Sequence, residues 1–154
     1  MNSRSRSAEE EMLGFFVGDW NNSGYVSPGP FGPGDPVTGK TSYHWDVGGK
    51  WLLYISRLEL PGLGDYKVHG GVAYNDRVGK YDAYAINNLG NLLVYEGEWT
   101  DDATLVFTLI HPQSQRRARI VYRVKSDGRF QMTSENESEE GEFVPYFETD
   151  FYHP

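Results

Sequence analysis

Short clusters of turn-forming residues divide the sequence after Gly18 into segments of about ten residues. Examples are Gly48-Gly49, residues 61–65, residues 87–91 and Ser126-Asp127-Gly128. Such residues accept positive φ or fix a turn, and the segments between them alternate apolar and polar side chains. Regular short strands joined by hairpins favour an up-and-down antiparallel β-barrel, because a closed barrel leaves no strand edge unpaired.

This pattern predicts an all-β fold of about ten strands. Before the strands, residues 8–17 place three glutamates ahead of an apolar group, which predicts a short helix with Ser7 as its N-cap and Gly18 at its end. Residues 1–7 are predicted to be a disordered tail, and residues 8–154 a single domain. We predict strands at residues 19–27, 38–47, 51–60, 66–75, 80–87, 92–99, 104–111, 116–125, 129–136 and 146–153.

Composition limits the classes of function. The net charge of −8 disfavours binding to nucleic acid, whose phosphates are negative. The chain has no cysteine, so disulfide bonds and thiolate chemistry are excluded. No long apolar run is present, so we expect no signal peptide, no membrane span and a cytoplasmic location. Aromatic residues make up 15% of the chain, which suits strands and pocket walls.

The loop at residues 28–36 is different from the others, because it holds four prolines and three glycines. Its composition excludes a strand or a helix. It is either a long surface loop or a lid over the barrel mouth, with Phe31 as the apolar tip of the lid.

Several motifs resemble a known superfamily. The Gly18-Asp19-Trp20 sequence, the preceding helical turn and the ten-strand meander resemble the calycin superfamily of lipocalins and fatty-acid-binding proteins. Residues 48–53 (Gly-Gly-Lys-Trp-Leu-Leu) and 71–75 (Gly-Val-Ala-Tyr-Asn) look more like a bacterial branch of lipocalin-like domains of unknown function related to nitrobindin, a haem-binding protein. The resemblance implies a barrel around a small-molecule pocket, with Trp20 plugging its floor. Unlike many members, this chain has no arginine on its last strand.

Strand alternation predicts which side chains face the interior. We expect Tyr43, Val47, Leu52, Ser56, Ser134, Phe147, Thr149 and Phe151 to face inward, and His44 and His69 outward. The ligand-binding residues predicted from this alternation and from the lid are Phe31, Trp45, Tyr54, Tyr95, Trp99, Phe107, Tyr122, Met132 and His153.

The one basic cluster, around residues 116–125, has an explanation in strand pairing. The turn at Ser126-Asp127-Gly128 places Arg119 opposite Glu135 and Arg117 opposite Glu137. Opposite charges across a strand pair stabilise a sheet by a few tenths to about 1 kcal/mol. We therefore predict a solvated charge ladder in preference to a phosphate site.

The chemistry that such a pocket could perform rests on few residues. His111, at a strand end, could act as a general acid or base with Tyr95 or Tyr54 as its partner. No spacing typical of a metal site, a nucleotide-binding loop or a nucleophilic serine is present, so no metal is predicted. A haem would take His153 or His111 as its axial ligand.

We therefore predict a barrel that binds a small hydrophobic or aromatic molecule. The alternatives are a metal-independent isomerase or cyclase acting on a natural-product intermediate, a haem protein similar to nitrobindin, and an interaction domain whose barrel is filled by side chains. A homodimer is compatible with each of them.

Overall fold

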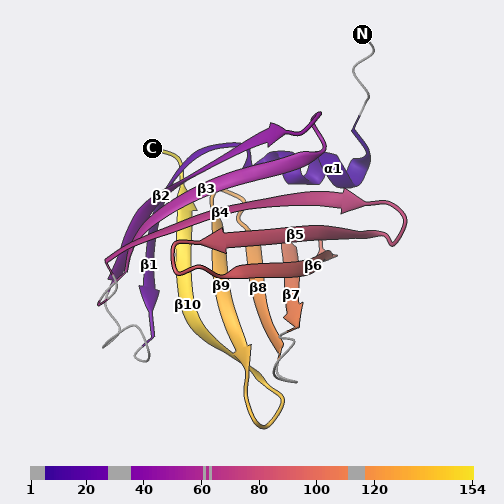
Figure 1. The fold of residues 1–154 in the computed structure, drawn as a ribbon. Helices are drawn as coiled ribbons and strands as arrows, with labels where there is room; N and C mark the ends of the chain where they lie inside the picture. The colour runs from indigo at the N-terminus through magenta and orange to yellow at the C-terminus, as the bar shows by residue number, and fades with distance from the viewer. Residues whose placement is uncertain (1–5, 28–35, 61, 63, 111–116) are drawn as a thin grey trace.

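The structure is a computed structural model that describes residues 6–27, 36–60, 62, 64–110 and 117–154 (Figure 1). In this part of the chain, ten strands form a closed barrel in which consecutive strands pair antiparallel and β1 pairs with β10. The predicted ten-stranded antiparallel barrel with a short N-terminal helix is confirmed. The strands are β1 (Gly18–Val26), β2 (Pro36–Asp46), β3 (Trp51–Leu60), β4 (Gly64–Asn75), β5 (Lys80–Asn87), β6 (Leu92–Asp101), β7 (Thr104–Ile110), β8 (Arg117–Val124), β9 (Phe130–Glu137) and β10 (Phe143–Tyr152).

The start of the last strand differs from the prediction. β10 begins at Phe143, not at Tyr146, and Phe143 pairs with Glu137. Pro145 has no N–H to donate to a ladder, so in the sequence it looks like the end of a strand. In the structure the register shifts between Pro145 and Phe147, and this β-bulge accommodates the proline within the strand.

The helix is shorter than predicted. α1 (Ala8–Leu13) passes into the 3-10 turn η1 (Gly14–Phe16), and Gly18, at φ +124°, begins β1 instead of ending the helix. The predicted N-cap is confirmed, because the Ser7 Oγ accepts from the Glu10 N–H and the Ser7 N–H donates to the Glu10 carboxylate, both at 3.2 Å. This reciprocal capping box satisfies two backbone donors that a helix start would otherwise leave free.

The predicted tail is described only at its end. Residues 1–5 lie outside the described residues, whereas Ser7 caps α1 and the Arg6 guanidinium lies 4.2 Å from the centroid of the Trp45 ring. Among the helices of the described part, none is long and apolar enough to cross a membrane.

Trp20 closes the end of the barrel that α1 covers. It is 1% exposed, and its indole N–H donates to the Phe16 carbonyl at 2.7 Å. Its ring meets Phe130 edge to face at 4.7 Å and is stacked against His153 at 3.9 Å. This part of the barrel is filled by a buried cluster: Leu13, Phe16, Trp20, Tyr43, Leu52, Val72, Tyr81, Ala83, Leu105, Phe107, Phe130 and Phe151.

The predicted charge pairs are present on β8 and β9, but the prediction that they are solvated is wrong for Glu135, which is 6% exposed. Arg117 pairs with Glu137 at 2.9 Å, and Arg119 pairs with Glu135 directly across the two strands. Both guanidinium groups also lie over the Phe143 ring, Arg119 at 4.1 Å from its centroid. The charges of these two arginines are therefore matched within the sheet.

Other predicted orientations can be compared with the structure. His44 and His69 are exposed, as predicted. The prediction that Val47 faces inward is wrong, because Val47 has φ 52° and is exposed in the turn that follows β2. The Gly48-Gly49 turn thus begins one residue earlier than the sequence pattern indicated.

The packing around Trp20 generates a prediction about stability. Phe130 is 0% exposed and contacts Trp20 and Phe151, so Phe130→Ala removes a fully buried ring. We expect the free energy of unfolding to fall by about 3–5 kcal/mol, measured by urea denaturation. The matched control is Tyr25→Ala, because Tyr25 is 48% exposed, and its loss should stay below about 1 kcal/mol. Equal losses in the two variants would contradict this assignment of the core.

Candidate functional site

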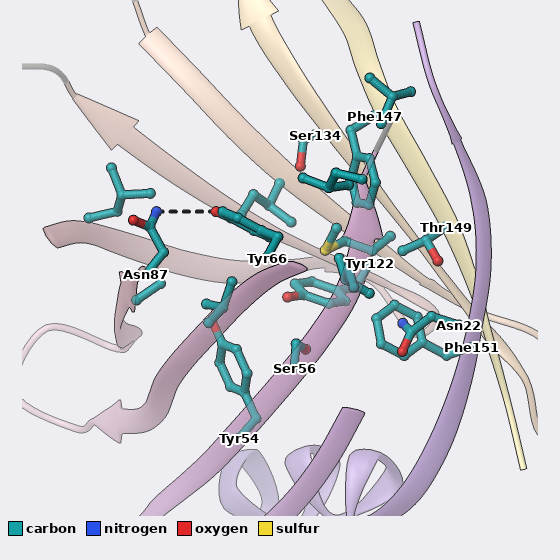
Figure 2. Close-up of a pocket in the computed structure, with 18 of the residues that line it drawn as sticks. Asn22, Tyr54, Ser56, Tyr66, Asn87, Tyr122, Ser134, Phe147, Thr149 and Phe151 are labelled. Carbon is teal, nitrogen blue, oxygen red and sulfur yellow. Dashed lines mark hydrogen bonds between the residues drawn. The ribbon is translucent and has the colours of Figure 1, made fainter. Parts of the chain in front are cut away.

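A cavity of about 170 Å³ occupies the half of the barrel away from α1 (Figure 2). Its walls come from strands on every side of the barrel, so closure of the sheet creates it. The lining residues are Asn22, Val26, Tyr43, Tyr54, Ser56, Leu58, Leu60, Tyr66, Val68, Ala85, Asn87, Leu93, Tyr95, Ile120, Tyr122, Met132, Ser134, Tyr146, Phe147, Thr149 and Phe151.

Three tyrosines form the floor of this cavity. Tyr43, Tyr54 and Tyr122 line both the large cavity and a second space of only about 20 Å³ on the side of α1. The Tyr43 and Tyr54 rings lie 5.3 Å apart, centroid to centroid. The interior is therefore filled by side chains below this tyrosine layer and open above it. This arrangement combines the open pocket and the filled barrel that the sequence presented as alternatives.

The cavity is electrically neutral. No aspartate, glutamate, lysine, arginine or histidine is among its described lining residues. Its polar groups are amides, hydroxyls and six phenols, those of Tyr43, Tyr54, Tyr66, Tyr95, Tyr122 and Tyr146. An apolar wall with a few polar groups is typical of small-molecule sites in proteins.

The phenols of the cavity keep their protons at neutral pH. Burial raises the pKa of Tyr54 and Tyr122 far above the ordinary phenol value, and neighbouring tyrosines add to the rise. Burial likewise raises the pKa of Tyr43, where a hydrogen bond with Tyr122 partly offsets it. The pKa values of Tyr66, Tyr95 and Tyr146 are raised mainly by burial as well. At neutral pH these groups can donate hydrogen bonds but cannot serve as bases.

A glycine makes room for Tyr54. A Cβ added at Gly70 would lie 2.3 Å from the Cζ atom of Tyr54, because Gly70 pairs with Tyr54 across β3 and β4. The bare backbone of β4 thus lets the ring lie flat over the strand. The position of this floor residue depends on glycine at that point.

Tyr66 is held near the other end of the cavity by Asn87. The Asn87 Nδ2 donates to the Tyr66 hydroxyl at 3.1 Å (Figure 2). The Asn87 Oδ1 accepts from the backbone N–H of Leu89 at 3.0 Å, which fixes the amide in the turn after β5. The Tyr66 ring is therefore positioned by the hairpin that joins β5 to β6.

A chain of polar side chains crosses the cavity wall from β3 to β1. The Thr41 hydroxyl donates to the Asn22 Oδ1 at 2.9 Å, and the Thr41 and Ser56 hydroxyl oxygens lie 2.6 Å apart. Asn22 and Ser56 line the cavity, whereas Thr41 lies behind them. Figure 2 shows Asn22 beside Thr149 and Phe151, on the side of the cavity formed by β1 and β10.

Four of the predicted ligand-binding residues come together in this cavity. Tyr54, Tyr95, Tyr122 and Met132 all line it, as do the residues Tyr43, Ser56, Ser134, Phe147, Thr149 and Phe151, which were predicted to face inward. Phe31 and His111 lie outside the described residues, so the lid and the proposed acid–base histidine have no description here.

Three other predicted residues lie at the α1 end. Phe107 is buried in the filled half and lines only the small space there. The Trp99 indole N–H donates to the Tyr81 hydroxyl at 3.0 Å, and Tyr81 in turn donates to the Glu9 carbonyl at 2.6 Å. Trp45 packs at the edge of the same core beneath Arg6. None of the three lines the large cavity.

The prediction that His153 faces the interior is wrong. His153 is exposed, and its ring is stacked on Trp20 with Nδ1 3.2 Å from the Asp19 carbonyl. The reason is that β10 ends at Tyr152, so the alternation no longer applies to His153. Beyond the strand, the imidazole covers the plug instead of entering the barrel.

Several lining residues were missed in the sequence. Asn22 lies two positions after Trp20 on β1, so alternation places it on the inner face. Tyr66 and Val68 lie four and two positions before Gly70 on β4, on the same face as Gly70. Alternation alone could therefore have identified all three. Tyr146 is different, because the bulge at Pro145 lets it line the cavity together with its neighbour Phe147. No simple alternation predicts two consecutive inward residues.

The described residues offer little to a metal or a haem. No group of three or more His, Cys, Asp or Glu side chains able to hold a metal ion occurs in the described ranges. The described cavity wall contains no imidazole, and a tetrapyrrole is far larger than a cavity of about 170 Å³. Haem does not fit this part of the site.

The raised pKa values predict how stability depends on pH. The native state keeps phenolic protons that the unfolded chain releases near pH 10, so stability is fully present below about pH 10 and falls as the pH rises further. In Tyr54→Phe this fall should be shallower by up to about 1.4 kcal/mol per pH unit, measured by denaturation at several alkaline pH values. Phe107→Leu, which removes no titrating group, should keep the slope of the original protein. An unchanged slope in Tyr54→Phe would contradict the prediction.

The contact at Gly70 predicts the effect of a single methyl group. Gly70→Ala should displace the Tyr54 ring, lower the free energy of unfolding by about 1–3 kcal/mol and change the near-ultraviolet circular dichroism of the tyrosines. Gly14→Ala is the matched control, because a Cβ there meets nothing within 4 Å and its φ of −59° suits alanine. A Gly70→Ala spectrum identical to that of Gly14→Ala would show that Tyr54 does not depend on this glycine.

Comparisons with known proteins agree with the barrel. The crystal structure of Rv2717c from M. tuberculosis is similar, with a TM-score of 0.67 and 12% sequence identity over 97% of this chain and 99% of that chain. At such low identity this likeness concerns the fold alone. The comparison with curated proteins gave no match. The model of the family described as "Protein of unknown function (DUF1579)" matches residues 5–153. Because this match covers nearly the whole chain, the protein belongs to the DUF1579 family.

Proposed function

We propose that this protein binds a small, uncharged, aromatic or largely apolar molecule in the barrel cavity. The observation that carries the proposal is the neutral lining, with six phenols and no charged side chain among the described residues. A charged ligand would lose its hydration there without gaining a counter-charge, which is unfavourable by several kcal/mol. A neutral ring gains contact with the aromatic and aliphatic walls.

The volume of the cavity narrows the size of the molecule. An apolar protein cavity of about 150 Å³ is known to hold benzene, whereas drug-sized ligands occupy pockets of about 300–1,000 Å³. The cavity of about 170 Å³ therefore suits one ring with a small substituent. A long fatty acid or a fused multi-ring compound would need the walls to move.

The closed barrel, its N-terminal helical cover and its internal cavity also support a place among the calycin-like binding barrels. That relationship is part of the proposal, and it rests on the fold and on the Gly18-Asp19-Trp20 entry. Many calycins have an arginine on the last strand against the entry tryptophan. In this chain the His153 ring is stacked on Trp20 instead.

The cavity gives less support to a proton-transfer enzyme. Tyr54 and Tyr95 hold their protons because burial raises their pKa values, so both are donors and neither is a base at neutral pH. No histidine or carboxylate lines the cavity in the described part of the chain. An isomerase or cyclase would depend on His111, which lies outside the described residues.

Ligand binding by the original protein and by a variant whose cavity is filled by a larger side chain tests the proposal. α-Methylstyrene, a neutral molecule with one ring, should bind the protein in an NMR titration, whereas benzoate, which is similar in size but charged, should bind at least about tenfold more weakly. Ala85→Phe fills the cavity from β5 and should abolish binding of α-methylstyrene.

The matched control is Ile86→Phe, on the outer face of the same strand, where Ile86 is 46% exposed. This variant should bind α-methylstyrene as the original protein does. Failure of the original protein to bind either of two neutral single-ring probes, α-methylstyrene and acetophenone, or equal binding of α-methylstyrene by Ala85→Phe, would overturn the proposal.

A further inference from the structure

Asn22 carries the one buried side-chain polar atom without a partner in the described part of the cavity wall. Its side chain lines the cavity, the residue is 2% exposed, and its Nδ2 has no hydrogen-bond partner. No other buried side-chain nitrogen or oxygen of the described residues lacks a partner. Burying an amide donor without a partner is unfavourable, so such groups are rare and need an explanation.

The hydrogen bonds behind Asn22 determine what it can offer to a ligand. Thr41 has one hydroxyl hydrogen, which it donates to the Asn22 Oδ1. The short contact between Thr41 and Ser56 therefore uses the hydrogen of Ser56. This chain occupies the carbonyl side of the amide, so the buried NH₂ group is the part of Asn22 that has no partner and can serve as a donor.

We infer that Asn22 is the specificity-determining residue of the cavity and that it selects a ligand with a carbonyl-type acceptor on an aromatic ring, such as an aryl ketone, aldehyde or ester. The inference rests on the proposed function and narrows its ligand class. The ligand oxygen accepts a hydrogen bond from Nδ2, which satisfies the amide that is otherwise unpaired.

The surroundings of Asn22 fit such a ligand. Phe151 and Thr149 lie beside the amide (Figure 2). Tyr122 and Met132 also line the cavity and add apolar surface for the ring of the ligand. The terminal torsion of asparagine is soft, so a small rotation can direct Nδ2 toward a bound oxygen. The neutral wall excludes a carboxylate, which leaves an uncharged carbonyl as the matching acceptor.

Two probes of nearly equal shape test the inference. Acetophenone carries a C=O group where α-methylstyrene carries C=CH₂, and the dissociation constants of both are measured by NMR titration. In Asn22→Leu the preference for acetophenone over α-methylstyrene should fall about tenfold relative to the original protein, because one hydrogen bond is lost. Taking the ratio within each protein cancels the different hydration of the probes.

Asn21→Leu is the matched control, with the same substitution one residue away on β1 and outside the cavity lining. It should keep the original ratio. If both probes bind but the ratio is equal in Asn22→Leu and the original protein, the inference is overturned and the proposed function stands. If neither probe binds the original protein, the proposed function itself fails.

A second measurement needs no variant and decides the matter if Asn22→Leu does not fold. In the ¹⁵N-labelled original protein, the side-chain NH₂ signals of Asn22 should shift downfield with acetophenone and much less with α-methylstyrene. Equal shifts with the two probes would overturn the inference.

Discussion

The packing of Trp20 into one end of the barrel determines how much of the interior remains for a cavity. Its ring is enclosed by Phe130 on one side and His153 on the other, and its N–H is bound to the Phe16 carbonyl. A ten-stranded barrel is otherwise wide enough to leave a continuous interior space. Because the plug and the buried cluster around it fill the α1 end of that interior, the large cavity is confined to the other end.

The tyrosine layer above the plug gives the cavity its chemical character. A floor of leucine or phenylalanine would also close the cavity, but it could not donate hydrogen bonds. Tyr43, Tyr54 and Tyr122 present hydroxyl groups that stay protonated because ionisation inside the barrel is unfavourable. The site therefore combines an apolar surface with neutral hydrogen-bond donors, a combination that is typical of small-molecule sites.

The sequence predicted the barrel well because turn residues and alternation are local signals. Alternation assigned Tyr54, Tyr95, Tyr122 and Met132 to the interior, and all four line the cavity. Alternation does not indicate where along the barrel axis each of these side chains lies. Phe107 and Trp99 belong to the α1 end, and this depends on how far each strand is shifted against its neighbours and on where the helix packs. Such information is tertiary and has no local signature.

Two further errors have local causes. Alternation was extended to His153, although the strand ends before it. The last strand was predicted to begin at Tyr146, whereas β10 begins at Phe143 and contains Pro145 in a bulge that also brings Tyr146 to the cavity. In both cases a rule for regular strands was applied where the backbone is irregular.

Asn22 was within reach of the same alternation, since it follows Trp20 by two positions on β1. Polar residues are normally expected on the outer face of a barrel strand, so the binary pattern of apolar and polar residues does not mark Asn22 as a lining residue. A polar residue at inward parity conflicts with the binary pattern, and such conflicts concentrate at functional sites. A ligand oxygen that accepts a hydrogen bond from the Asn22 amide would pair the one buried side-chain donor that has no protein partner among the described residues.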